Sequence, residues 1–187
     1  MEFRTGLGSA WLDLLATLIG RYQREQTDLL ADPAALRAWL AEHDLAPAGR
    51  ITAADVDRVR EVREALHAVA VATIAGRRPK SDDARVVAAA LALDRPPTLR
   101  AGAAGLRAEH PASARVALAR LVRSAVDTLT GPDRGHLRTC GDDTCSGIFL
   151  DLGGRRRWCS AQRCGVRVRV RAHRARAHAQ DGDGGTA

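Results

Sequence analysis

The stretch that decides the fold is residues 140–164, CGDDTCSGIFLDLGGRRRWCSAQRC, because it holds all four cysteines of the chain. They form two pairs, Cys140 with Cys145 and Cys159 with Cys164, and each pair encloses four residues. Two short knuckles of this kind can aim four thiolates at one tetrahedral metal ion. The spacing therefore predicts a metal-binding site for one zinc ion with these four ligands.

Two other uses of four cysteines are open at this point, a pair of disulfides and an iron–sulfur cluster. Disulfides are typical of small secreted domains, and the first residues, MEFRTG, lack the cationic start and long apolar stretch of a signal peptide. An iron–sulfur cluster needs the same thiolates, but paired knuckles around a hairpin-like insert suit zinc better. We therefore expect zinc, and a cytoplasmic protein.

The net charge of +7 is distributed unevenly along the 187 residues. Residues 1–133 carry 18 Lys/Arg against 17 Asp/Glu, whereas residues 134–178 carry 11 arginines against 3 aspartates. A guanidinium group forks onto phosphate oxygens or the major-groove edge of guanine. This asymmetry favours a polyanion as the partner of the C-terminal segment over a merely solubilising charged face.

Residues 1–131 predict a mostly helical domain whose core is built from Ala, Val and Leu, because aromatic residues make up only 3% of the chain. Helix-start signals, a capping residue before an apolar stripe, occur at Ser9, Asp32-Pro33, Thr52, Ser81 and Ser113. The apolar stretch after Ser9 could equally begin as a short buried strand. Residues 94–110 predict a loop or a two-strand hairpin around the glycines, and Gly131-Pro132 marks the domain boundary. No apolar segment is long enough to span a bilayer.

Residues 134–178 predict a small zinc-binding module consisting of a knuckle, a β-hairpin, a second knuckle and a basic helix. In the expected hairpin, residues 148–152 form one strand, Gly153-Gly154 the turn and residues 155–159 the returning strand. The expected fold class is therefore mainly α, with a minor β component (α+β). Residues 179–187 are expected to be a disordered tail.

Two aromatic residues of this module, Phe149 and Trp158, are expected to pack against the zinc sulfurs, because so small a module needs them for its core. Ser160 offers an N-cap for a helix that continues to about His178. The alternation of Val and Arg over residues 166–171 also fits a strand.

The candidate nucleic-acid-binding residues are the arginines of this module, which would meet phosphates or base edges of double-stranded DNA. They are Arg155, Arg156, Arg157, Arg163, Arg167, Arg169, Arg171, Arg174 and Arg176. The alternative is a structural zinc module that binds a protein or an RNA, although it has few aromatic platforms for RNA bases. An enzyme is not expected, because four cysteines close the shell that a catalytic zinc leaves open. His136, His173 and His178 are alternative ligands, but their arginine-rich surroundings favour surface positions.

Asp13, Thr17 and Arg21 align on one helix face and are candidates for a small-molecule pocket, although a satisfied buried polar cluster is favoured. Glu61 and Glu64 lie among arginines and predict solvated ion pairs. One finger alone offers little specific contact area, which favours a homodimer on DNA.

Several motifs carry a resemblance to a known family. In the C-terminal module they are Arg138-x-Cys140, Cys145, Phe149-x-Asp151, Arg157-Trp158-Cys159-Ser160 and Cys164-Gly165-x-Arg167. Upstream they are Leu12-Asp13, Ala16-Thr17, Arg21, Asp28-Leu29-Leu30, Asp32-Pro33 and Leu36-x-x-Trp39-Leu40. The first set resembles the CGNR zinc finger of bacterial stress-response transcriptional regulators, and the second resembles the ABATE domain that precedes this finger.

The resemblance implies a zinc-dependent, DNA-binding regulator of transcription, cytoplasmic and nucleoid-associated, with an N-terminal domain that senses a small molecule or another signal. One departure falls on the signature itself. The family has asparagine where this chain has Val166, and valine cannot make the hydrogen bonds of an amide.

Overall fold

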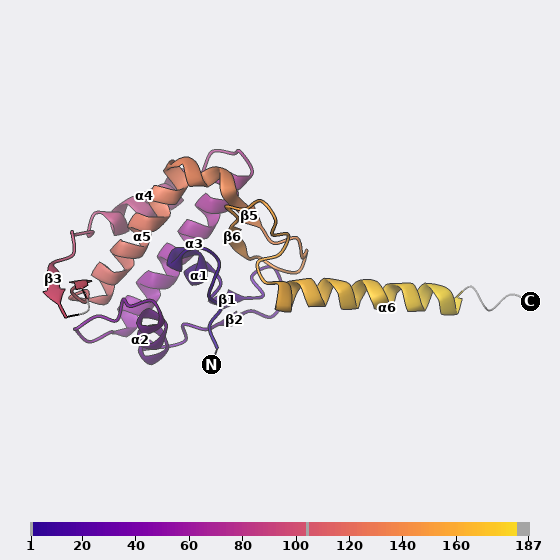
Figure 1. Ribbon diagram of the computed structural model, residues 1–187, viewed down its shortest axis with the longest axis horizontal. Coiled ribbons are helices and arrows are strands. Elements are labelled where there is room, and N and C mark those ends of the chain that lie inside the picture. The colour runs from indigo at the N-terminus through magenta and orange to yellow at the C-terminus, as the bar shows by residue number, and fades with distance from the viewer. Residues whose placement is uncertain (1, 104, 183–187) are drawn as a thin grey trace, which may run out of the picture.

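The computed structural model describes residues 2–103 and 105–182, and side chains of the last helix as far as Ala177. Its elements are α1 (Ala10–Leu15), β1 (Leu18–Ile19), β2 (Thr27–Asp28), α2 (Pro33–Glu42), α3 (Ala53–Ile74), α4 (Ser81–Leu91), β3 (Leu99–Gly102), β4 (Gly105–Ala108), α5 (Ala114–Thr130), η1 (Pro132–His136), β5 (Leu137–Thr139), β6 (Ile148–Leu150), η2 (Ala161–Gly165) and α6 (Val166–Gly182). The expected mainly α fold is confirmed. Helices α1 to α5 form a body from which α6 projects alone (Figure 1).

The helix α3 is the centre of the body, and it packs against α1, α2, α4 and α5. It begins as predicted with a capping box, in which the Thr52 side chain accepts from the Asp55 amide and the Asp55 carboxylate accepts from the Thr52 amide. The starts of α2 and α5 are also confirmed, because Asp32 and Ser113 each accept an amide hydrogen bond from the third residue after them. Local capping chemistry therefore sets the starts of α2, α3 and α5, whereas Ser9 makes no capping hydrogen bond and Ser81 is the first residue of α4 and not its cap.

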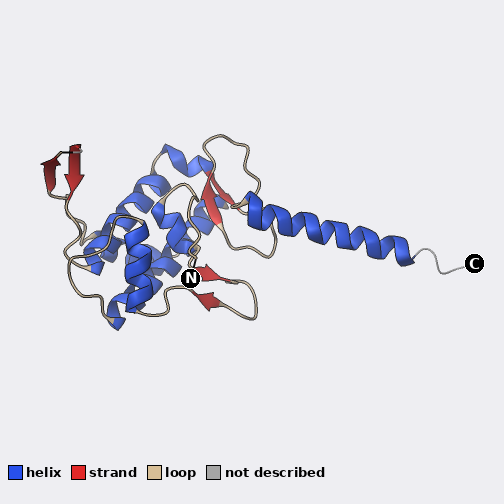
Figure 2. Ribbon diagram, turned by 60° about the horizontal axis from the view of Figure 1, so that its bottom comes forward, coloured by secondary structure: helices blue, strands red, loops and turns tan. Residues whose placement is uncertain are grey.

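The stretch after Ser9 begins as the expected helix and not as the alternative buried strand. Residues 10–15 form α1, and Leu18–Ile19 then form β1, which pairs antiparallel with β2. The expected hairpin around the glycines is present as β3 and β4, although all of its described residues are exposed. It stands apart from the body at the end opposite α6 (Figure 2).

The expected hairpin of residues 148–152 with 155–159 is wrong. The strand β6 pairs instead with β5, in the register Leu137 with Leu150, so that the first cysteine pair lies in the connection between these strands. The other edge of β6 is also occupied, because the Leu150 amide donates to the Leu7 carbonyl at 2.8 Å. Gly8 makes this approach possible, since a Cβ there would lie 2.7 Å from the Leu150 Cβ.

The Asp151 side chain gives residues 155–159 a different conformation from the expected strand. Its carboxylate accepts hydrogen bonds from the Arg155 amide at 3.3 Å and the Arg156 amide at 3.0 Å. These contacts close a compact turn after β6 in place of a second strand.

The helical body and the zinc module share one hydrophobic core. Leu137, Ile148 and Phe149 of the module are at most 1% exposed and belong to the same buried cluster as Leu66 of α3 and Trp11 of α1. The predicted disordered tail, 179–187, begins inside α6, which extends to Gly182, and residues 183–187 lie outside the described part of the chain. Among the described residues, no helix is long and apolar enough to cross a membrane.

Candidate metal centre and basic helix

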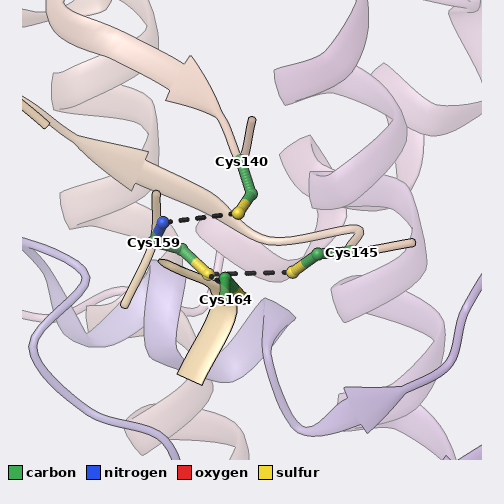
Figure 3. A group of neighbouring side chains, drawn as sticks. All are labelled: Cys140, Cys145, Cys159 and Cys164. Carbon is green, nitrogen blue, oxygen red and sulfur yellow. Dashed lines mark hydrogen bonds between the residues drawn. The ribbon is translucent and has the colours of Figure 1, made fainter. Parts of the chain in front are cut away.

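The four cysteines come from two knuckles that face each other (Figure 3). Cys140 directly follows β5, and Cys145 lies in the loop that returns to β6. Cys159 precedes Ser160, whose side chain accepts from the Arg163 amide as the predicted cap, and Cys164 lies in η2, the turn that leads into α6. The metal site therefore fixes the base of the basic helix, which is a helix and not the alternative strand.

The spacing of the sulfurs fits a single zinc ion. All four Sγ atoms lie within 4.8 Å of one another, with 3.7 Å between Cys145 and Cys159 and 3.5 Å between Cys159 and Cys164. A tetrahedron with Zn–S bonds of about 2.3 Å places its sulfurs about 3.8 Å apart. None of the cysteines forms a disulfide, and their four thiolates would hold one Zn²⁺ in a closed shell.

Gly147, two residues after Cys145, lets the backbone pass close to the sulfurs, where a side chain would collide with them. A Cβ on Gly147 would lie 2.9 Å from the Cys159 Sγ and 3.2 Å from the Cys145 Sγ. The Gly147 amide also donates to the Cys145 Sγ at 3.3 Å, and the Cys159 amide donates to the Cys140 Sγ at 3.5 Å. Such amide donors stabilise the negative charge of bound thiolates.

Two arginines donate to the sulfurs from opposite ends of the chain. Arg4 lies 3.3 Å from the Cys159 Sγ and 3.7 Å from the Cys145 Sγ, and Arg167 lies 3.4 Å from the Cys164 Sγ. Burial opposes the charge of Arg4, but the neighbouring sulfurs outweigh it and raise the pKa of this guanidinium. The two cations offset the net charge of −2 that four thiolates and one Zn²⁺ would carry. Sequence reasoning missed Arg4, because no local pattern links position 4 to cysteines more than 140 residues away.

A buried carboxylate fixes the direction of α6. The Asp142 side chain is 0% exposed and accepts from Arg167 at 2.6 Å, from Arg171 at 2.7 Å and from the Thr144 hydroxyl at 2.8 Å. Although burial alone would raise the pKa of Asp142, the hydrogen bonds from Thr144 and Arg167 lower it far below the usual range. Arg167 and Arg171, which we expected to contact DNA, therefore hold the base of α6 against the first knuckle.

The structure separates the remaining predicted arginines into two groups. Arg163 pairs with Glu2 at 2.8 Å, Arg156 lies over the Phe149 ring at 4.7 Å and donates to the Cys159 carbonyl, and Arg157 lies over the Trp158 ring at 5.6 Å. The second group makes no ion pair within the described residues: Arg155, Arg169, Arg174 and Arg176. The last three of these are exposed on α6.

Asp13, Thr17 and Arg21 do not share the expected helix face, because α1 ends at Leu15, but all three side chains make polar contacts, as in the interpretation that the sequence favoured. Asp13 accepts from the Leu7 amide at 3.0 Å, and Arg21 pairs with Glu64. At the centre is Arg63, which is 2% exposed. It donates to Thr17 at 2.9 Å and to both carboxylate oxygens of Asp28, at 2.8 and 2.7 Å. Its place seven residues after the buried Val56, on the apolar face of α3, is the signal that could have revealed it.

Comparison with known protein families gives two matches in the expected order. The family ABATE, described as "Putative stress-induced transcription regulator", matches residues 8–132. The CGNR zinc finger matches residues 136–177, which enclose all four cysteines. No curated protein matches the chain.

Proposed function

The chain belongs to the ABATE family and carries a CGNR zinc finger after that domain, and from this premise we propose that it regulates transcription by presenting α6 to double-stranded DNA. In this account, zinc and the shared core hold the helix, and its free arginines bind the duplex. One helix covers few base pairs, so two copies are expected on a specific site.

The observation that carries the proposal is the exposure of α6 beyond its anchor. The helix projects from the body (Figure 1), and Arg169, Arg174 and Arg176 are exposed on it without an ion pair in the described part of the chain. Its 17 residues span about 25 Å, and the major groove, about 12 Å wide, admits one α-helix. Because α6 is held at its first residues and carries unpaired arginines beyond them, it suits insertion into the major groove of DNA.

The arrangement supports two different roles for the arginines of α6, positioning of the helix and contact with DNA. Arg167 pairs with Asp142, and Arg171 pairs with Asp142 and Asp143, so both set the angle of the helix. Arg169 and Arg176 lie seven residues apart and share one face. The free side chains would contact phosphates or the edges of guanine bases. Val166, at the start of the helix, is 43% exposed, so its lack of an amide affects the surface offered to the partner.

The closed metal shell and the buried aromatics support DNA over the alternative functions. Four cysteine ligands leave no open position for a substrate, which supports a binding role without catalysis. Phe149 is 0% exposed, and Trp158 is covered by Arg157, so neither offers a free ring for stacking single-stranded RNA.

The test compares two triple variants of the zinc-loaded protein in fluorescence-anisotropy titrations with duplex DNA over a salt series. Arg169→Gln, Arg174→Gln and Arg176→Gln remove three unpaired charges from α6, whereas Arg85→Gln, Arg100→Gln and Arg107→Gln remove the same number of arginine charges from α4 and the β3–β4 hairpin, where Arg85 pairs with Asp82 and Arg100 with Glu109. We expect the α6 variant to bind roughly tenfold or more weakly, and its salt slope to fall by about 0.9 for each phosphate that it no longer neutralises. Equal affinities and slopes for the two variants would contradict the proposal.

A further inference from the structure

We infer that a cleft at the junction of the helical body and the zinc module binds a small organic anion, with an acidic group of phosphate or carboxylate type on an apolar body. The cleft has a volume of about 690 Å³. Its walls come from the end of α3 and the loop after it, the end of α5, η1 and β5. This volume lies within the range of about 300–1,000 Å³ that is typical of small-molecule sites.

Three guanidinium groups line this cleft and define the charge of its occupant. They belong to Arg77, Arg134 and Arg138, and none of the described residues that line the cleft is acidic. Arg138 donates to the Gly135 carbonyl at 2.7 Å and to the Leu137 carbonyl at 2.9 Å, which holds its side chain at the wall. Arg77 and Arg134 make no ion pair with any described residue. An anion would relieve the mutual repulsion of the three cations and could accept paired hydrogen bonds from them.

A second cleft of the molecule is also lined by arginines, but they are paired with carboxylates. Arg58 and Arg115 line that cleft together with Leu93 and Leu118, so it also combines cations with an apolar wall. There, however, Arg58 is paired with Glu61 at 2.6 Å, and Arg115 lies 3.7 Å from Asp55. Its cations already have counter-charges, so it has no comparable affinity for an anion.

The floor of the junction cleft is apolar, so it favours a ligand whose remaining part, beyond the acidic group, is also apolar. Leu129 and Leu137 are 8% and 1% exposed and continue into the shared core, and Ile74 packs against it. A bare inorganic ion would leave this surface wet, whereas an apolar body would cover it. The duplex backbone is polar and would leave the apolar floor uncovered, so a small amphipathic anion fits better than a nucleic-acid phosphate.

The cleft lies where a bound ligand would connect the helical body to the metal module. Arg138 lies two residues before the zinc ligand Cys140, while Arg77 follows α3 of the body. A ligand that bridges Arg77 and Arg138 therefore ties the body to the strand that leads into the first knuckle. An effect of this ligand on DNA affinity would rest on the function proposed above, but the binding itself does not.

The test uses anilinonaphthalene sulfonate, an apolar fluorescent anion, titrated into the full zinc-loaded chain. We expect saturable binding of one probe per chain, weakened by about tenfold or more in the variant Arg77→Gln with Arg134→Gln. The matched control, Arg58→Gln with Arg115→Gln, removes the same charge from the second cleft and should retain the affinity of the unaltered protein. Far-ultraviolet circular dichroism confirms that each variant is folded.

Three outcomes would overturn the inference. They are absence of saturable binding, equal loss in both variants, and undiminished binding in Arg77→Gln with Arg134→Gln. Inorganic phosphate serves as a competitor and should displace the probe only weakly, because it cannot cover the apolar floor. Displacement by phosphate at the same concentrations as by unlabelled probe would contradict the apolar part of the assignment. None of these readouts involves DNA, so failure here leaves the proposed DNA binding untouched.

Discussion

Arg4 links the first residues of the chain to the zinc site, because its guanidinium donates to Cys159 and Cys145 in a partly buried position. Hydrogen bonds to metal ligands commonly change metal affinity by about 10–100-fold. We expect Arg4→Met to weaken zinc binding by roughly tenfold, measured by competition with a chromophoric chelator. Arg24→Met, at an exposed position of the β1–β2 loop, is the control. Equal zinc affinities of these two variants would show that Arg4 has no role at the metal.

His67 makes stability depend on pH. Burial, aided by the neighbouring charge of Arg21, lowers its pKa to about 4 from an ordinary value near 6.5. Between pH 6.5 and pH 4, His67 is protonated in the unfolded chain but stays neutral in the folded chain. Its contribution to the free energy of unfolding is therefore complete above pH 6.5 and is lost as the pH falls toward 4. The loss approaches about 3 kcal/mol.

The measurement for His67 is urea unfolding from pH 7 to pH 4 for the unaltered protein and for His67→Phe. Protonation of the zinc thiolates affects both proteins, so the difference between the two curves isolates the histidine. We expect this difference to change steadily between about pH 6.5 and pH 4, in the direction of relative loss for the unaltered protein. If the free energies of unfolding of the two proteins changed in parallel with pH, the lowered pKa of His67 would be refuted.

Individual residues also show what a sequence can and cannot predict. The cysteines were predictable because ligand spacing is a local property, and so were the caps at Asp32 and Thr52. Arg4 and Asp142 were not, because their roles depend on partners that only the tertiary fold brings near. The same limit hid the buried carboxylate of Asp142 that pairs with Arg167 and Arg171, two residues expected to contact DNA.

At the scale of elements, the junction between the first knuckle and α6 decides where the basic helix points. Asp142→Asn would leave Arg167 and Arg171 without their buried counter-charge, while all four zinc ligands stay in place. We expect unchanged zinc stoichiometry, lower helicity by circular dichroism and DNA affinity reduced about tenfold or more, since the charge-assisted hydrogen bonds that hold the base of α6 are weakened.

Asp143→Asn is the matched control for this prediction, because Asp143 also pairs with Arg171 but is 85% exposed at its side chain. Its removal should change helicity and affinity little, as expected for a surface ion pair. Indistinguishable behaviour of the two variants would mean that burial of Asp142 does not position α6.

The strands of the module show why pairing was harder to predict than helices. The apolar run at β6 and the glycines after it fit a local hairpin, but its hydrogen bonds go to β5 and to Leu7. Strand pairing depends on which edges the rest of the chain occupies, whereas α2, α3 and α5 begin at caps within their own sequence.

At the scale of the whole molecule, the zinc module is part of the core and not an appendage. Its buried Leu137, Ile148 and Phe149 join the cluster of the helical body, and residues 7 and 8 pack on β6. Composition and charge suggested two separate units, because neither property reports a shared core. Loss of zinc should therefore lower the stability of the helical body as well as that of the zinc module.

We expect a chelator to lower the melting temperature of the whole chain in one cooperative transition, measured by circular dichroism of the helical signal. Cys159→Ser, which removes one ligand, should melt like the chelated protein and should not respond to added zinc. A helical signal that melts at the same temperature with and without zinc would show that the body is independent of the module.

The central claim, that this chain is a DNA-binding regulator, is tested most directly by anisotropy titrations of the zinc-loaded protein across a salt series. The partners are duplex DNA from its own upstream region, random duplex and RNA of matched length. The account predicts a preference of about a thousandfold or more for its own DNA over random duplex. Equal, steeply salt-dependent binding to all three, or no binding to any, would contradict it.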